Sequence, residues 1–493
     1  NVSKVSREVA DLVAKLYRSL KTKHADREAD VIKFTLQCII AMFAEDIGLL
    51  PQEYFTTLLY EGARARDVEK RLRELFRVMS TRDVPPPRAV PFFNGGLFTD
   101  PVALSLGDAQ VTALTKASEA NWTYVDPHIF GSVFQGIMDD AERHASGAHY
   151  TANDDIMRVV GPTIVEPWRS RVRGASSLKE LLDVRADLLK FRVLDPACGS
   201  GNFLYVAFRE LYRLDTELLA RIREFPSTQG QAKTRITWSA GIQTSNFFGI
   251  DINPFAVELA KVTLNIAKKI AYDERKEMLA ELVGQVELDI DPSLPLDNLD
   301  GNIVCADALF TEWPEVDAIV GNPPILGDRK IRGELGADYL HRLQETSGVD
   351  GTVDLSCYWF RRAHDRLPEG ARAGLVGTSG VRIGKAREAS LDYIVANGGT
   401  ITNAVSSRLW PGDAALNVSM VNWLKGHADG PHYLVVEEQV FPLNRISTHL
   451  QLHADVSETR TISRNGAGTA MGVIFGSDYF RVHASSGVPF DEL

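Results

Sequence analysis

The feature that most limits what this chain can fold into is an alternation, after about residue 150, of short apolar segments with helical stretches. The apolar segments lie at 191–194, 247–250, 303–305, 318–320, 373–376 and 418–424. The helical stretches between them include 202–223, 254–275, 354–367 and 385–396. This alternation predicts an α/β fold with a mostly parallel sheet covered by helices on both faces. Such sheets bind ligands at the carboxyl ends of their strands.

The regions on either side of this pattern differ from it. From Val2 to about Leu75, apolar residues recur at intervals of three and four, which predicts helices; after the prolines at 85–87, further helix is expected through about Ala145. Beyond about residue 428, strand and turn formers dominate. We therefore expect a helical domain, an α/β domain and an incomplete strand-rich third region, at 1–145, 146–427 and 428–493. Because the first residue is Asn rather than Met, we also expect the natural start to be missing.

Composition restricts the class of protein further. With 44% hydrophobic and 24% charged residues, the chain resembles ordinary soluble globular proteins. The four cysteines form no CxxC pair, which argues against a zinc site or disulfides and suits a reducing cytoplasm. The longest apolar stretch, around Phe34 to Ala44, falls well short of the ~20 residues that span a bilayer. We expect a cytoplasmic protein with no membrane segment and no metal.

The formal net charge of −11 is unfavourable for binding nucleic acid, since such domains usually carry a basic face. A local basic surface remains compatible with this charge. The basic residues within 64–73 are interleaved with acidic ones and are interpreted as a solvated helix face. Two further basic clusters, within 329–332 and 382–387, each follow a candidate strand and are the stronger candidates.

A glycine-rich turn after the first strand is a candidate ligand site. In VLDPACGSGNFL, Gly199 and Gly201 let the backbone approach a ligand and direct helix N-terminal amides at it. A dinucleotide fingerprint continues with a third small residue after these two glycines, which this turn lacks, so nicotinamide or flavin binding is disfavoured. Asp195, just before the glycines, would repel a pyrophosphate but suits a cationic ligand.

The next two strands also end in carboxylates. Asp251 follows the second strand, where an acidic side chain accepts hydrogen bonds from a ribose diol. It lies further from the glycines than the usual ~20 residues, and a surface insertion around 227–235 would account for the excess. Asp307, after the third strand, is a candidate acceptor for an adenine amino group. Three such residues at successive strand ends favour a ligand site over separate turns or caps.

The fourth strand runs into Asn322-Pro323-Pro324-Ile325. The Asn322 side-chain oxygen and the Pro323 carbonyl are two acceptors fixed by prolines that lack donors of their own. Such a pair can accept both N–H groups of an exocyclic amino group or a carboxamide and direct the nitrogen lone pair at an electrophile. The pattern indicates alkylation of a weakly nucleophilic nitrogen, promoted mainly by proximity and electrostatics.

These four strand ends, in this order, resemble the class I S-adenosylmethionine-dependent methyltransferases, which have a Rossmann-like sheet. DPACGSGNF followed by NPP resembles the DNA adenine-N6 methyltransferases, and GAHYT at 147–151 resembles their motif that closes over the methionine end of the cofactor. Other segments are similar to the MmeI-like type IIL restriction-modification enzymes and related phage-defence methyltransferases: PFFNGGLF, DPHIFGSVFQ, NPFAVELAKVTL, LPLDNLDGNI, EWPEVDAIVGNPP and LWPGDAALNVSMV. The resemblance covers roughly residues 30–425. It implies a helical connector before the methyltransferase domain and a target-recognition domain after it.

The resemblance also implies roles for individual residues. Asn322, Pro323, Pro324 and Ile325 would form the catalytic motif that holds the extruded adenine of double-stranded DNA. The residues implied to contact S-adenosylmethionine are Gly147, His149, Tyr150, Thr151, Asp195, Ala197, Gly199, Gly201, Asn202, Asp251, Ile252, Asp307, Ala308 and Asn322.

Two departures from the family pattern matter. The family places an aromatic residue after the second proline to stack on the base, whereas this chain has Ile325; Trp410 is a candidate to stack instead. Type IIL enzymes also carry an N-terminal nuclease, and no strand-borne D…ExK is visible here. The Glu-x-Lys at Glu274 follows a helical stretch and is expected to be solvated, so we predict no DNA cleavage by this chain.

Two other functions remain open. The same acceptors would hold a glutamine carboxamide in protein methylation. Alternatively, Ile325 marks a cofactor-binding DNA-recognition subunit whose catalysis is weak or depends on a partner. The acidic balance of the chain is consistent with partner subunits from a restriction or defence system.

Overall fold

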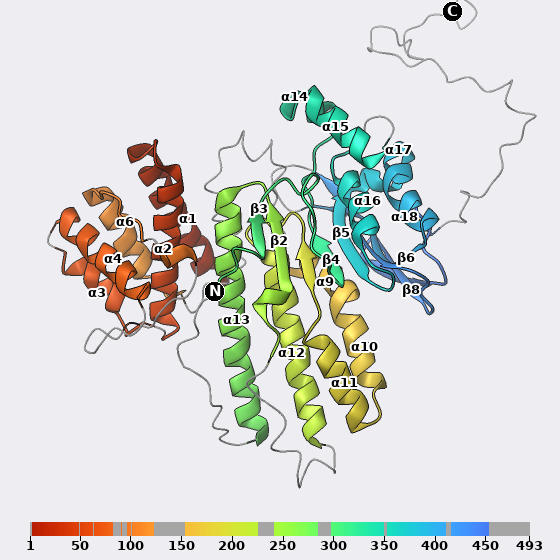
Figure 1. Ribbon diagram of the computed structural model, residues 1–493, viewed down its shortest axis with the longest axis horizontal. Helices are drawn as coiled ribbons and strands as arrows, with labels where there is room; N and C mark the ends of the chain where they lie inside the picture. Colours follow the sequence, from red (N-terminus) through yellow and green to blue (C-terminus); the bar gives the residue numbers. More distant parts are fainter. Residues whose placement is uncertain are drawn as a thin grey trace, which may run out of the picture. The chain divides into compact units, whose positions relative to one another are not determined.

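A computed structural model gives the fold of the chain (Figure 1). It describes residues 2–48, 50–62, 64–81, 90, 96–99, 101–122, 153–224, 241–283, 297–349, 353–410 and 416–452. The chain forms two compact units, residues 1–451 and 452–493, and all described residues except Leu452 belong to the first.

The described residues of the amino-terminal part are mainly helical, as their periodicity predicts. The helices are α1 (Val2–Lys23), α2 (Glu28–Asp46), α3 (Tyr54–Tyr60), α4 (Ala65–Met79), α5 (Gly96–Thr99) and α6 (Asp108–Ser118). Val9, Val13 and Leu16 lie on one face of α1 and are buried. The same core includes Phe255 of α13 (Pro254–Val283), whose ring centroid lies 5.5 Å from that of Tyr17. The predicted break at 85–87 and helix at 123–145 lie outside the described residues.

A nine-stranded sheet, counted over the described residues, forms the centre of the α/β region in the order β3-β2-β1-β4-β5-β7-β6-β8-β9. Strands β1 to β5 are parallel, β7 is antiparallel to both β5 and β6, β8 is parallel to β6, and β9 is antiparallel to β8. The strands are β1 (Val193–Asp195), β2 (Phe247–Asp251), β3 (Ile303–Cys305), β4 (Ala318–Gly321), β5 (Arg372–Thr378), β6 (Gly399–Leu409), β7 (Asn417–Lys425), β8 (His432–Val436) and β9 (Gln439–Leu443). All six predicted strands are confirmed. Of the strand character predicted beyond residue 428, the part that falls within the described residues, up to 452, is confirmed by β8 and β9, which extend the same sheet.

Successive strand side chains enter two different cores, one on each face of the sheet. In β4, Ala318 and Val320 belong to one core and Ile319 to the other. The first core is completed by α9 (Asn153–Val160), the π-helical turn Gly161–Val165, α10 (Glu166–Gly174), α11 (Leu178–Leu188), α12 (Asn202–Glu224) and α13. The second is completed by α14 (Asp328–Glu334), α15 (Ala337–Ser347), α16 (Ser356–Arg366), the turn Ser379–Arg382 and the continuous helical stretch of α17 (Gly384–Arg387), the π-turn Glu388–Asp392 and α18 (Tyr393–Ala396). The predicted two-sided helical cover is confirmed.

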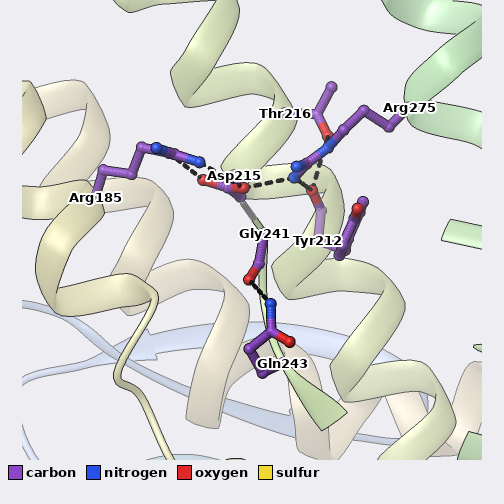
Figure 2. A network of polar contacts seen from close by, with 7 residues as sticks. All are labelled: Arg185, Tyr212, Asp215, Thr216, Gly241, Gln243 and Arg275. Atoms are coloured by element: carbon purple, nitrogen blue, oxygen red, sulfur yellow. Dashed lines mark hydrogen bonds and ion pairs between the residues drawn. The ribbon is translucent and has the colours of Figure 1, made fainter. Parts of the chain in front are cut away.

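A buried ion-pair network joins α11, α12 and α13, three of the helices that complete the first core (Figure 2). Asp215 of α12 is fully buried; it accepts a hydrogen bond from Arg185 Nε of α11 at 2.7 Å and one from Arg275 Nη2 of α13 at 2.5 Å. The Arg275 guanidinium also donates to Thr216 Oγ1 at 2.9 Å and lies 3.8 Å from the ring centroid of Tyr212. The network fixes α11, α12 and α13 to one another.

Within the described ranges, the structure contains no helix that is both long and apolar enough to cross a membrane.

Candidate active site at the carboxyl ends of the strands

Four neighbouring parallel strands deliver the predicted polar residues to one edge of the sheet. β1 ends at Asp195, β2 ends at Asp251, Asp307 lies just after β3, and Asn322 follows β4 directly. In the order β3-β2-β1-β4, the progression of strands reverses between β1 and β4. Open α/β sheets bind ligands outside the carboxyl ends of strands at such a reversal.

Asp195 is the most deeply buried of these groups, with 0% of its surface exposed. Its Oδ1 accepts a hydrogen bond from Ala197 N at 3.1 Å, and its Oδ2 has no hydrogen-bond partner among the described residues. A Cβ atom at Gly321 would lie 2.5 Å from Asp195 Oδ1, so only glycine fits at the end of β4. Burial raises the pKa of Asp195 to about 8, and the charge of Asp251 adds to this effect. A cation or hydrogen-bond donor against Oδ2 would stabilise the carboxylate.

The glycines of the turn after β1 have two different roles. Gly201 has a φ of +85°, and a Cβ there would lie 3.0 Å from the Cα of Ala260, so this glycine allows close packing on α13. Gly199 has a φ of +50°, and a Cβ there would meet no described atom within 4 Å. The backbone at Gly199 is therefore open to close approach by a ligand.

The Asp251 carboxylate orders the turn that follows β2. Its Oδ1 accepts from Asn253 N and its Oδ2 from Gly199 N, both at 2.9 Å. Asn253 Oδ1 in turn accepts from Phe255 N in the first turn of α13. Burial is the main cause that raises the pKa of Asp251. Ile252, between the two, is 67% exposed and offers an apolar surface at this edge.

Asp307 is held by a residue that sequence reasoning did not identify. Its Oδ1 accepts from Leu309 N at 2.9 Å, and its Oδ2 accepts from the hydroxyl of Tyr339 on α15 at 3.0 Å. The Tyr339 ring meets Phe310 edge-on, with 5.3 Å between centroids. The Ala308 side chain is buried in the second core, so only its backbone is available to a ligand.

The NPPI segment lies between β4 and α14. Asn322 and Pro324 are half-buried, and Pro323 is buried. Ile325 is half-buried and packs against the first core, which also contains Trp410. The following Leu326 carbonyl accepts from Leu355 N at 2.9 Å, which anchors the end of the segment.

A second residue missed in the sequence is Trp359 of α16. Its Nε1 donates to the carbonyl of Pro196 at 3.3 Å and so supports the turn after β1. Tyr339 and Trp359 are separated from their partners by 32 and 163 residues, and no local pattern signals such contacts.

The remaining predicted site residues are placed as follows. Asn202 begins α12; it is 8% exposed, and its Oδ1 lacks a hydrogen-bond partner among the described residues. Gly147, His149, Tyr150 and Thr151 lie outside the described residues. Within the part of the chain that the structure describes, no three His, Cys, Asp or Glu side chains are grouped as a metal ion requires.

Two of the basic residues interpreted as a solvated helix face pair with glutamates. Arg71 lies 2.6 Å from Glu61 and Arg73 lies 3.1 Å from Glu69, as expected for a balanced helix face. The prediction that Glu274 follows the helical stretch and is solvated is wrong, because this residue lies within α13, is half-buried and pairs with Arg209 and Arg213 of α12.

The arrangement fits S-adenosylmethionine. Buried oxygens of Asp195 and Asn202 with no partner among the described residues can accept from an amino group, and the open backbone at Gly199 permits close approach. The Asp251 and Asp307 carboxylates are fixed at successive strand ends, where ribose and adenine acceptors are needed. The exposed Ile252 can cover one face of a purine.

Similarity to known proteins identifies the family of this chain. Residues 172–427 match the family described as MmeI, DNA-methyltransferase domain, and residues 29–98 match MmeI, helicase spacer domain. DNA methyltransferase A of Bacillus subtilis (strain 168) is 27% identical over 470 residues, which are 90% of this chain and 51% of that protein. A putative type II restriction enzyme and methyltransferase of Methanocaldococcus jannaschii is 25% identical over 317 residues, covering 51% of this chain and 26% of that protein. The chain thus spans about half or less of these curated relatives.

A solved structure supports the fold. The type IIL restriction-modification enzyme MmeI, solved in complex with DNA, has a TM-score of 0.77 and 24% identity, over 92% of this chain and 62% of that chain. The expected class I methyltransferase fold is therefore confirmed. Since the domain match covers more than half of its residues, the chain belongs to the MmeI DNA-methyltransferase family, whose cofactor is S-adenosylmethionine.

Proposed function

We propose that this chain transfers a methyl group from S-adenosylmethionine to the N6 amino group of adenine in double-stranded DNA. The observation that carries the proposal is the position of the Asn322-Pro323 turn. The turn directly follows Gly321 at the end of β4, and a Cβ atom at Gly321 would lie 2.5 Å from Oδ1 of the buried Asp195. S-adenosylmethionine supplies, when bound, an electrophilic methyl group on a sulfonium.

The residues at successive strand ends would each contact a different part of the cofactor. Asp195 and Asn202 would accept from the amino group of its methionine end, and Asp251 would accept from its ribose. Asp307, oriented by Tyr339, would accept from its adenine, against which Ile252 would pack. The remaining contacts follow from the family resemblance: Gly147, His149, Tyr150, Thr151, Ala197, Gly199, Gly201 and Ala308.

The target adenine must leave the duplex to reach this edge of the sheet. Asn322 Oδ1 and the Pro323 carbonyl would then accept the two N6 hydrogens and direct the nitrogen lone pair at the methyl group. Methyl transfer would form the new N–C bond as the C–S bond breaks, with the electron pair staying on sulfur and one N6 proton leaving to solvent. Positioning and fixed dipoles would supply most of the rate enhancement.

The substitution Asn322→Ala tests this role. It removes one acceptor for the reacting amino group, so methylation should fall by about 10²–10³-fold, as for loss of a single preorganised group at a reacting centre. Calorimetric titration should show cofactor affinity within a few-fold of wild type. The control is Asn397→Ala, at an exposed asparagine after α18. Methylation by Asn322→Ala at a rate close to that of the control would refute the assignment.

The wider biological role follows from the same proposal. We infer a helical connector at 1–145, a methyltransferase domain at 146–427 and the start of a target-recognition region at 428–493. The enzyme would work in the cytoplasm in a restriction-modification or phage-defence system, together with partner subunits. DNA is favoured over a protein glutamine because relatives along most of the chain are named as DNA methyltransferases.

One observation favours a second candidate function. Ile325 packs against the first core and provides no aromatic face for a base. A cofactor-binding recognition subunit with weak or partner-dependent catalysis is therefore the alternative.

A further inference from the structure

Two segments that carry basic residues follow neighbouring strands at the same edge of the sheet. α14 begins directly after the 322–327 loop, and the turn Ser379–Arg382 with α17 follows β5, the parallel neighbour of β4. Figure 1 shows α14, α15 and α17 on the side of the sheet where these strands end. We call Lys330, Arg332, Arg382, Ile383 and Lys385 the basic edge.

Three cations of the basic edge differ from the arginines of α4 that pair with glutamates. Lys330, Arg332 and Lys385 are exposed and form no ion pair with a described residue. By contrast, Arg71, Arg73 and Arg77 of the amino-terminal helices each pair with a glutamate. In a chain with a net charge of −11, positive charge that no described carboxylate pairs with is suited to a polyanion.

Ile383 is an apolar residue presented among these charges. It is 62% exposed, directly follows Arg382, and precedes Gly384, whose φ is +52°. Its amide donates to the Gly380 carbonyl at 2.9 Å, so the turn that presents it is ordered. Proteins that distort DNA use such apolar side chains to contact bases that no longer have a stacking partner.

We propose that the basic edge binds the phosphates on both sides of the extruded adenine and that Ile383 packs against the bases left in the helix. This inference rests on the proposed function for the extruded base, while the phosphate contacts require only that the chain binds duplex DNA. Each lysine or arginine contributes through the release of counterions, and Ile383 compensates for the disrupted stacking.

The phosphate contacts are tested by the salt dependence of binding to a duplex oligonucleotide. The variant Lys330→Ala/Arg332→Ala/Lys385→Ala should bind at least tenfold more weakly, and the slope of log K against log[salt] should become shallower by about 0.9 for each phosphate that is no longer neutralised. Arg66→Ala/Lys70→Ala/Lys116→Ala removes the same charge from exposed positions of α4 and α6 and should leave the slope unchanged. Equal effects of the two triple variants, or a wild type that does not bind duplex DNA, would overturn the proposal.

The role of Ile383 is tested with a DNA substrate from which the target adenine is extruded at a lower free-energy cost. Ile383→Ala should methylate a paired target about tenfold more slowly than wild type and should recover when the target adenine is mispaired, because a mispaired base is easier to extrude. Leu182→Ala, at an exposed leucine of α11, is the matched control. Wild-type rates for Ile383→Ala on the paired target would refute this role. A wild type that binds duplex DNA without methylating it would contradict the proposed function, while the salt slopes would still decide the phosphate contacts.

Discussion

At the scale of single residues, burial sets the chemistry of Asp195. Its carboxyl is enclosed by the turn after β1 and by Gly321, and the raised pKa of about 8 keeps it largely protonated at neutral pH when no cation is bound. A cationic methionine end would reverse this preference. Asp195, which would favour binding of the cofactor, therefore destabilises the folded ligand-free protein at high pH, where it loses its proton.

The raised pKa of Asp195 predicts how the stability of the folded protein depends on pH. An unfolded Asp loses its proton near pH 4, whereas folded Asp195 keeps it to about 8, so the folded protein binds more protons in between. The contribution of protonated Asp195 to the free energy of unfolding is complete below about pH 4 and is lost as pH rises through about 8. In urea unfolding of the ligand-free protein between pH 5 and 8.5, Asp195→Asn should flatten the decline, and the exposed control Asp183→Asn should not. Identical pH profiles for wild type and Asp195→Asn would show this assignment to be wrong.

Because Ile325 stands where the family has an aromatic residue, we expect an aromatic substitution there to raise methylation activity. A base stacked on an aromatic side chain gains about 1–3 kcal/mol, so Ile325→Tyr should raise the methylation rate by about tenfold to a hundredfold if stacking limits turnover. Ile325→Val keeps an apolar side chain without a ring and should not raise it. Single-turnover rates on DNA would distinguish the two. No gain for the tyrosine variant, with cofactor binding intact, would favour the recognition-subunit alternative.

At the scale of helices, the Asp215 network predicts a large effect on stability. Asp215→Asn leaves Arg185 and Arg275 buried without their shared counter-charge, so it should lower the free energy of unfolding by about 3–5 kcal/mol. Asp187→Asn removes an exposed partner of Arg171 and should lower it by less than about 1 kcal/mol. Urea titration of both variants measures the difference, and equal losses would contradict a special role for the network.

The sequence revealed some elements more clearly than others. β1, β2 and β4 are buried on both faces and therefore read as apolar runs between turns. β6 was not predicted because Thr402 and Ser406 are polar although buried; the Thr402 hydroxyl donates to Asn422 O, and Ser406 O accepts from Ser419 Oγ. The strand-end carboxylates could be found because each immediately follows a strand. Tyr339 could not, because only the folded chain brings α15 to Asp307.

At the scale of the whole first unit, α13 connects its two regions. Phe255 and Leu259 belong to the core of the amino-terminal helices, whereas Val257 and Ala260 belong to the first core of the sheet. The same helix begins at the Asn253 cap that Asp251 fixes. The helical region is thus packed on the element that supports the proposed cofactor site.

The most direct test of the account is to incubate the protein with labelled S-adenosylmethionine and unmethylated genomic DNA, digest the DNA to nucleosides and assay N6-methyladenine. The account predicts labelled N6-methyladenine with the wild-type protein and an initial rate about 10²–10³-fold lower with Asn322→Ala. Absence of N6-methyladenine with the wild-type protein, when titration confirms cofactor binding, would contradict the proposal that this chain is itself the catalyst.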